Sequence, residues 1–146
     1  MRHFAASMIV CALLAGGIYA ANEISVTTSI KVSKGNYDLS RSVGGNQIDM
    51  SGVNVSSLIQ DIGTGAHELI VVATDVTTNG YAYCRMLTTN ATYYVDIGPQ
   101  GASTNLLPFI RLYAGETAVF RLHPTNAVYA QASGGTVSLE WTVIEN

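Results

Sequence analysis

The side chains that could do chemistry in this 146-residue chain are few, and none stands in a recognisable catalytic pattern. Beyond residue 20 the histidines are His67 and His123, which lie 56 positions apart and each flank an expected strand. That spacing is not the spacing of a metal site. Cys84 stands alone in an apolar run, which predicts a small buried hydrophobe and not a nucleophile. We therefore expect no enzyme activity and no catalytic, cofactor-binding or metal-binding residue.

The carboxylates and hydroxyls fit the same expectation. Four aspartates, Asp49, Asp61, Asp75 and Asp96, lie near strand ends or turns, where Asp is favoured for turn hydrogen bonds. They form no calcium-loop pattern. The many serines form no nucleophile elbow, and no glycine-rich stretch has the spacing of a phosphate or dinucleotide loop. A small hydrolase that uses scattered Asp, His and Ser is left as a third hypothesis.

Charge excludes one class of partner. Charged residues make up 12% of the chain, about half the usual fraction of soluble domains. Beyond residue 20, six Lys/Arg stand against ten Asp/Glu, which leaves a net charge of −4 and no basic patch. We therefore expect no nucleic-acid binding. A surface with so few charges suits lasting contact with neighbouring subunits, because its burial desolvates few ions.

Residues 1–20 form an apolar leader that has two interpretations. Arg2 and His3 precede an uncharged stretch, and Ile18-Tyr19-Ala20 could serve as a cleavage site before Ala21. That layout is typical of a secretory signal peptide, which would involve the membrane only transiently. Alternatively, the segment is a retained N-terminal arm. The first residue of the native protein separates the two, because Ala21 indicates export and Met1 indicates an arm.

Residues 21–146 predict one all-β domain, an antiparallel β-sandwich of jelly-roll-like type with about ten short strands. Polar and apolar residues alternate, and turn residues recur at short intervals. The expected strands cover residues 24–32, 37–43, 47–50, 57–62, 67–74, 81–87, 92–97, 108–113, 117–123, 127–132 and 136–144.

Several finer expectations follow from the pattern. Gly44-Gly45-Asn46 is predicted to be a turn, and residues 67–74 a central strand that is buried on both faces. Residues 88–91 are predicted to join their neighbouring strands as a hairpin. In the last strand, four apolar residues should share one face. These are Val137, Leu139, Trp141 and Val143.

Tyrosines are concentrated in the second half of the chain. The residues concerned are Tyr81, Tyr83, Tyr93, Tyr94, Tyr113 and Tyr129. A tyrosine-rich face can bind sugar or protein. We expect about half of these rings to pack between the sheets or along the rim of the sandwich instead.

Essentially all of residues 21–146 resembles a group of small virion proteins of tailed phages. The segments that carry the resemblance are Asn22-Glu23-Ile24, Val26 to Ile30, Lys34-Gly35-Asn36, Gly80 to Leu87, Thr89-Asn90, Tyr94 to Gly98, Pro108 to Leu112, Ala114-Gly115-Glu116, Arg121-Leu122 and Val137 to Glu145. The shared residues are strand and turn residues. The resemblance implies a structural component of the particle, namely a capsid decoration, head-fibre or tail-associated subunit. It brings no catalytic or ligand residues, and the leader departs from the group's usual start.

Two main hypotheses result. The first is a non-enzymatic virion structural protein, whose partners are copies of itself as a homo-oligomer and other virion proteins. The second is a secreted bacterial β-sandwich protein that binds carbohydrate or builds an extracellular filament. The leader and the tyrosines favour the second hypothesis.

Overall fold

A computed structural model describes residues 23–102 and 105–146 and divides the chain into two units, Met1–Asp49 and Met50–Asn146. The predicted leader, residues 1–20, lies outside the described residues. Among the residues that are described, no helix is long and apolar enough to cross a membrane. All ten strands of the described part lie in antiparallel sheets, which confirms the all-β prediction.

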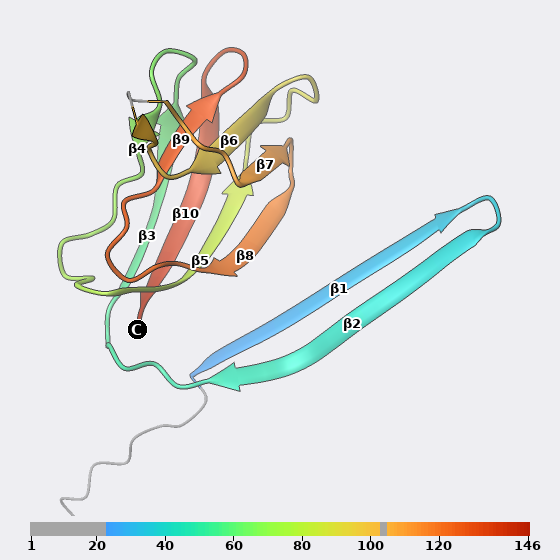
Figure 1. Cartoon of the computed structure of the whole chain (residues 1–146), viewed down its shortest axis with the longest axis horizontal. Helices are drawn as coiled ribbons and strands as arrows, with labels where there is room; N and C mark the ends of the chain where they lie inside the picture. The colour runs from blue at the N-terminus through green and yellow to red at the C-terminus, as the bar shows by residue number, and fades with distance from the viewer. Residues whose placement is uncertain (1–22, 103–104) are drawn as a thin grey trace, which may run out of the picture. The chain divides into compact units, whose positions relative to one another are not determined.

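The first unit holds a long β-hairpin formed by β1 (Ile24–Lys34) and β2 (Tyr37–Ile48), seen in blue and cyan in Figure 1. The alternating residues of both segments favour extended strands. Lys34 pairs with Tyr37 across a two-residue loop. Gly35 in that loop has a φ of 59°, a backbone conformation that glycine adopts without strain. The chain therefore reverses between β1 and β2 in a tight hairpin turn.

The prediction of a turn at Gly44-Gly45-Asn46 was wrong, because β2 runs through these residues. Gly44 and Gly45 together lie opposite the single residue Thr27, between the pairs Thr28–Val43 and Val26–Asn46. This is a β-bulge, and Gly45 has the positive φ of 65° that glycine permits. Its N–H points to the Thr27 hydroxyl, 3.3 Å away. The two glycines therefore form a bulge within β2 and do not end the strand.

The second unit holds eight strands in two four-stranded sheets (Figure 1). We name the sheet with the order β3-β10-β5-β8 sheet I, and the sheet with the order β4-β9-β6-β7 sheet II. The strands are β3 (Val55–Ile62), β4 (Glu68–Leu69), β5 (Asn79–Met86), β6 (Tyr94–Gly98), β7 (Ile110–Tyr113), β8 (Thr117–Arg121), β9 (Tyr129–Ala132) and β10 (Val137–Glu145).

The core lies between the inner faces of the two sheets, as in a β-sandwich. Along β10 the residues alternate between buried and half-buried, and the four apolar residues predicted to share a face are all fully buried. Sheet I also contributes Met86, and sheet II contributes Val95 and Ile97. Trp141 is the largest of the fully buried side chains. Its indole N–H is the one buried side-chain polar atom of the described residues without a hydrogen-bond partner.

The strands of the second unit pair in a nested order. The outermost strands pair first, β3 with β10, then β4 with β9, β5 with β8, and β6 with β7. The pairs β10–β5 and β9–β6 complete the two sheets. β1 and β2 pair with each other and belong to neither sheet. The sequence placed all of residues 21–146 in one sandwich, whereas the sandwich-like unit begins at Met50 and residues 24–48 form a separate hairpin.

Two further strand predictions differ from the structure. Residues 88–91 do not close a hairpin, because β5 lies in sheet I and β6 in sheet II. Residues 67–74 are not a central strand, because β4 spans only Glu68–Leu69 at the edge of sheet II. Beyond it, Val71 is 53% exposed and its N–H donates to the Gln60 side chain at 3.0 Å. A continuous apolar run therefore covers an edge here and does not fill the centre of a sheet.

Candidate functional site: exposed interaction surfaces

The residues singled out for chemistry do not meet in one place. No group of three or more His, Cys, Asp or Glu side chains within the described ranges could hold a metal ion. The His67 ring meets the edge of Tyr129, with ring centres 5.1 Å apart. Asp61 accepts a hydrogen bond from the Ser138 hydroxyl at 2.7 Å, and Asp96 binds Arg111. Each of these side chains therefore has a local structural partner.

Cys84 is a buried thiol, as the sequence predicted. Its side chain is fully buried in β5, and its Sγ lies 3.7 Å from the carbonyl oxygen of Ala118. Burial raises the pKa of the thiol to about 12, and a backbone hydrogen bond with Ala118 offsets this rise only partly. Because the thiolate is the reactive form, this cysteine is inert at neutral pH.

A carboxylate clamp at the end of β10 escaped the sequence analysis. Glu145 is 6% exposed, and its two oxygens accept five hydrogen bonds. The Thr77 hydroxyl and N–H donate at 2.7 and 2.9 Å. The N–H groups of Val53 and Asn54 donate at 3.2 Å, and the Asn54 side chain at 3.1 Å. The bonds from Thr77, followed by those from Asn54 and Val53, lower the pKa of the carboxyl to about 2. The clamp ties two loops, those before β3 and before β5, to the end of β10 and serves the fold.

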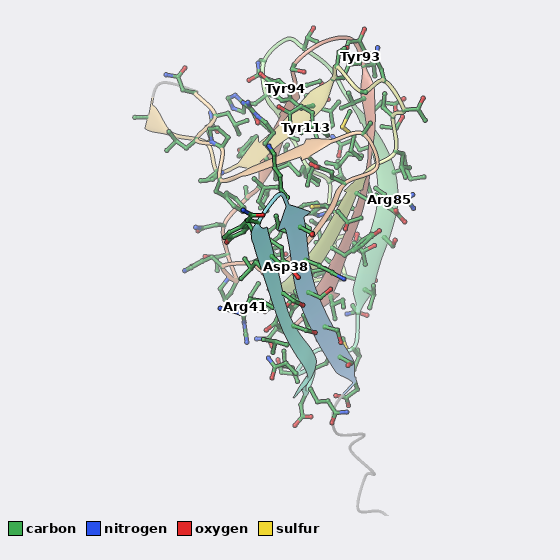
Figure 2. All side chains as sticks on the ribbon, turned by 90° about the vertical axis from the view of Figure 1, so that its right-hand side faces the viewer. Asp38, Arg41, Arg85, Tyr93, Tyr94 and Tyr113 are labelled. Carbon is green, nitrogen blue, oxygen red and sulfur yellow. The ribbon has the colours of Figure 1, made fainter. Side chains whose placement is uncertain are left out.

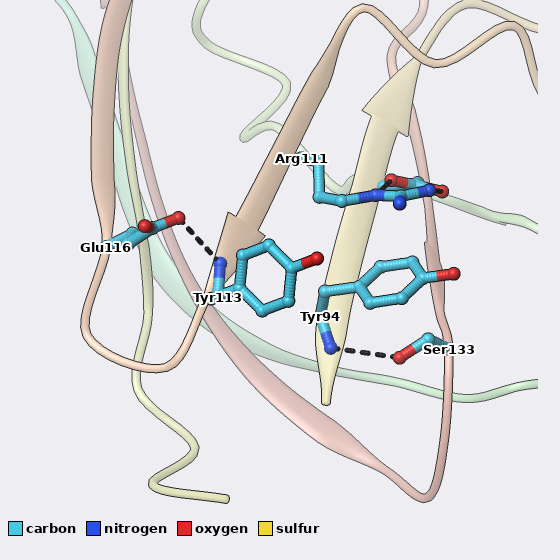
Figure 3. A network of polar contacts seen from close by, with 6 residues as sticks. Tyr94, Arg111, Tyr113, Glu116 and Ser133 are labelled. Atoms are coloured by element: carbon cyan, nitrogen blue, oxygen red, sulfur yellow. Dashed lines mark hydrogen bonds and ion pairs between the residues drawn. The ribbon is translucent and has the colours of Figure 1, made fainter. Parts of the chain in front are cut away.

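The outer face of sheet II carries a polar and aromatic cluster. Arg111 on β7 binds Asp96 on β6 through two bonds of 2.8 and 2.9 Å. The guanidinium carbon of Arg111 also lies 3.8 Å from the centre of the Tyr94 ring, which it covers (Figure 3). The Tyr113 ring meets the Tyr94 ring at an angle of 61°, with centres 5.6 Å apart. The arrangement is a fixed and partly exposed surface for contact.

A hollow of about 420 Å³ adjoins this face near β4 and β9. Its lining includes His67, Gln100 and Gln131. The Gln131 side chain donates to the carbonyl oxygen of Gly65 at 2.6 Å, which orients it. The hollow thus combines an aromatic edge with amide groups, a composition that can hold a small polar ligand.

Most of the tyrosines face outward, contrary to the expectation for half of them. Along β5, Ala82, Cys84 and Met86 fill the core, so Tyr81 and Tyr83 point to the other face. On sheet II the outward rings are those of Tyr94, Tyr113 and Tyr129. Only Tyr93, of the six rings considered, packs against the core. Figure 2 labels Tyr93, Tyr94 and Tyr113 on the second unit.

The hairpin has one apolar face and one polar face. Side chains of directly paired residues share a face of a two-stranded sheet, and successive residues alternate between faces. Asp38 and Arg41 of β2, labelled in Figure 2, therefore lie on opposite faces. The face that includes Arg41 consists of Ile24, Val26, Thr28, Ile30, Val32, Lys34, Tyr37, Leu39, Arg41, Val43, Asn46 and Ile48. The other face consists of Ser25, Ser29, Lys31, Ser33, Asp38, Ser40, Ser42 and Gln47.

The bulge in β2 keeps the apolar face continuous. Val43 and Ile48 are an odd and an even position, which in a regular strand would place them on opposite faces. The two residues Gly44 and Gly45 opposite Thr27 shift this alternation by one, so Ile48 pairs with Ile24 on the apolar face. The bulge at Gly44 and Gly45 therefore extends the apolar face to the base of the hairpin.

This apolar face is exposed along its outer two thirds. Val43 is 64% exposed, Tyr37 58%, Ile30 55% and Val32 37%. An exposed apolar stripe of this kind marks an interaction site.

The outer face of sheet I is the second apolar surface. Its side chains form three rows, each with one residue from β3, β10, β5 and β8 in that order. The first row is Val55, Ile144, Tyr81 and Arg121. The second row is Ser57, Thr142, Tyr83 and Val119, and the third row is Ile59, Glu140, Arg85 and Thr117. Ile59 is 65% exposed, Val55 53% and Val119 46%. The tyrosines and Ile144 between them are half-buried. The face mixes apolar and aromatic side chains with the charged residues Arg121, Glu140 and Arg85.

Comparison with known proteins yields no relative: no family model, no curated protein and no solved structure matches the chain.

Proposed function

We propose that this protein is a non-enzymatic structural subunit that assembles through contacts between copies, as a capsid decoration, head-fibre or tail-associated subunit of a tailed phage. The observation that carries the proposal is the long hairpin with one exposed apolar face. The scarcity of charged residues supports it, because assembly surfaces bury few ions.

The hairpin needs a partner for physical reasons. A two-stranded sheet is at most marginally stable in water on its own, and among the described residues no third strand pairs with β1 or β2. Strands of 11 and 12 residues also give the hairpin two long edges to which no other described strand adds. Burial of the apolar face in an assembly removes the exposed surface and stabilises the ribbon at the same time.

The second unit fits the same proposal as a jelly roll. Nested pairing of β3 to β6 with β10 to β7 is what results when an eight-stranded antiparallel ribbon wraps into two sheets. Viral capsid domains and lectin domains both use this architecture. Because one fold hosts many functions, it supports the proposal without distinguishing assembly from sugar binding.

Mass spectrometry of phage particles purified from a host lysate tests the proposal. We expect peptides of this chain at a stoichiometry comparable with that of the major head or tail proteins. Its absence from the particles, or its presence only at trace level, contradicts the proposal.

A second candidate function is carbohydrate binding by an exported protein, and the outer face of sheet II favours it. The Tyr113 ring is 42% exposed, and the nearby hollow offers the amides of Gln100 and Gln131. Binding on a glycan array that is lost in Tyr113→Ala and Gln131→Ala, but not in Tyr37→Ala on the hairpin, would support it. A flat array removes its basis.

A further inference from the structure

We propose that the apolar face of the hairpin docks on the outer face of sheet I of a second copy of the chain. The inference rests on the proposed function, since it names the surface through which the copies assemble. It is carried by the shape, side-chain chemistry and charge of the two faces.

The two faces match in shape. Each is the surface of a twisted antiparallel sheet, and such surfaces pack on each other about 10 Å apart. The 11 residues of β1 extend about 36 Å at ~3.3 Å per residue. The strands β3 and β10, with eight and nine residues, extend about 26 and 30 Å on the same scale and so match most of that length. A ribbon laid on sheet I would form a third layer on the sandwich-like unit.

The two faces also match in side-chain chemistry. The hairpin presents Ile30, Val32 and Val43, which are exposed. Sheet I presents Val55, Ile59 and Val119 around two half-buried tyrosine rings. Each surface exposes several large apolar side chains close together, and exposed apolar surface of this kind is typical of an interaction site.

Charge favours sheet I over a second hairpin as the partner. Residues 24–48 contain three Lys/Arg and one Asp, a net charge of +2, whereas residues 50–146 contain three Arg and seven Asp/Glu, a net charge of −4. Lys34 and Arg41 lie on the apolar face of the hairpin, which holds no acid. The outer face of sheet I carries Glu140 and Asp61 beside Arg85 and Arg121, so its own charges balance. Unlike the hairpin face, it therefore offers carboxylates to Lys34 and Arg41. Two hairpins would instead bring like charges together.

The contact has a consequence for the form of the assembly. The donating surface and the receiving surface are different, so each copy gives one hairpin and receives one. An interface of this kind is heterologous and builds a ring where the rotation closes, or a filament where it does not.

Photo-crosslinking of a mixture of unlabelled and ¹⁵N-labelled full-length chains tests the inference. Val43 is replaced by p-benzoyl-phenylalanine, and the cross-linked peptides are identified by mass spectrometry. Mixed-isotope cross-links from position 43 to peptides of β3, β5, β8 or β10 support docking on a second copy. Cross-links within one chain, or between two hairpins, overturn it and leave the possibility of assembly intact. A chain that is monomeric at every concentration overturns both this inference and the proposed function.

Substitutions on sheet I give a matched control. The double variant Val55→Thr, Val119→Thr keeps β-branched side chains in both strands and makes the docking face more polar. We expect its self-association to weaken at least tenfold in sedimentation velocity. Val71→Thr is the control, because Val71 is as exposed as Val55 but lies outside the face. Equal association of all three proteins contradicts the inference.

Discussion

The double substitution Ile30→Thr, Val43→Thr is the sharpest perturbation of the hairpin. Both residues lie on the apolar face, on neighbouring pairs of β1 and β2. Threonine keeps the branched shape that favours a strand, and Val43→Thr creates a Thr–Thr pair with Thr28, which is tolerated across strands. The substitution therefore changes the polarity of the face and not its backbone.

The magnitude follows from the exposed fractions. Ile30 and Val43 are 55% and 64% exposed, so roughly half of each side chain is still to be buried on docking. Full burial of such a side chain contributes about 1.5–3 kcal/mol, so about half of that, ~1 kcal/mol, is lost at each position. Two positions together cost about 2 kcal/mol of association free energy. At 1.4 kcal/mol per decade, the dissociation constant should rise about 30-fold.

Sedimentation velocity over a concentration series measures this dissociation constant. The control is Ser29→Ala, Ser42→Ala, a directly opposed pair on the polar face of the same hairpin, which should leave association unchanged. Far-UV circular dichroism of both variants monitors the strand content. Equal weakening in the control, or unchanged association in the Ile30→Thr, Val43→Thr variant, would refute the assignment of the apolar face as the contact.

Further predictions concern the clamp, the core and the bulge. Glu145→Gln should lower the melting temperature above pH ~4.5. The Glu145 carboxyl has a pKa of about 2 in the folded protein against an ordinary value of 4.5. The difference in melting temperature between the two proteins should therefore shrink as the pH falls from about 4.5 to about 2, as measured by thermal unfolding at a series of pH values. Trp141→Ala should lower the free energy of unfolding by about 3–5 kcal/mol in urea, as expected for a fully buried ring, and Trp141→Phe should lower it less. Gly45→Val should weaken self-association, because the φ of 65° at this position strains a branched residue. Gly44→Val should leave self-association unchanged, because Gly44 has no positive φ and no atom lies within 4 Å of an added Cβ. The Cys84 thiol should stay unmodified by maleimide in the native protein at pH 7.5 and react in urea, as read by peptide mass spectrometry.

Strand content was predictable from the sequence because it depends on local alternation. The last strand shows this best, since Val137, Leu139, Trp141 and Val143 repeat every second residue and are all buried. The thiol of Cys84 was equally predictable from its apolar neighbours. The pairing of strands depends on residues far apart in the chain, which local patterns do not encode. Residues 88–91 looked like a hairpin turn for this reason, although the strands on either side lie in different sheets.

The candidate surfaces were harder to predict than the strands. Gly44-Gly45 has the composition of a turn, and only the pairing with Thr27 reveals a bulge. In a regular strand Ile48 would lie on the polar face, so the apolar stripe is not evident from the sequence. The clamp on Glu145 joins residues 53, 54 and 77 to residue 145, contacts that no local pattern predicts. Alternation also does not reveal that residues 24–48 pair only with each other and belong to neither sheet of the sandwich-like unit.

Hydrogen–deuterium exchange of the hairpin amides tests most directly whether the protein assembles through this ribbon. An isolated hairpin exchanges rapidly, because it opens often, whereas a ribbon buried between copies is protected. We predict that protection of residues 24–48 rises steeply with protein concentration, while protection of β10 stays constant. Hairpin amides that exchange equally fast at all concentrations, in a sample that has assembled, would contradict the account.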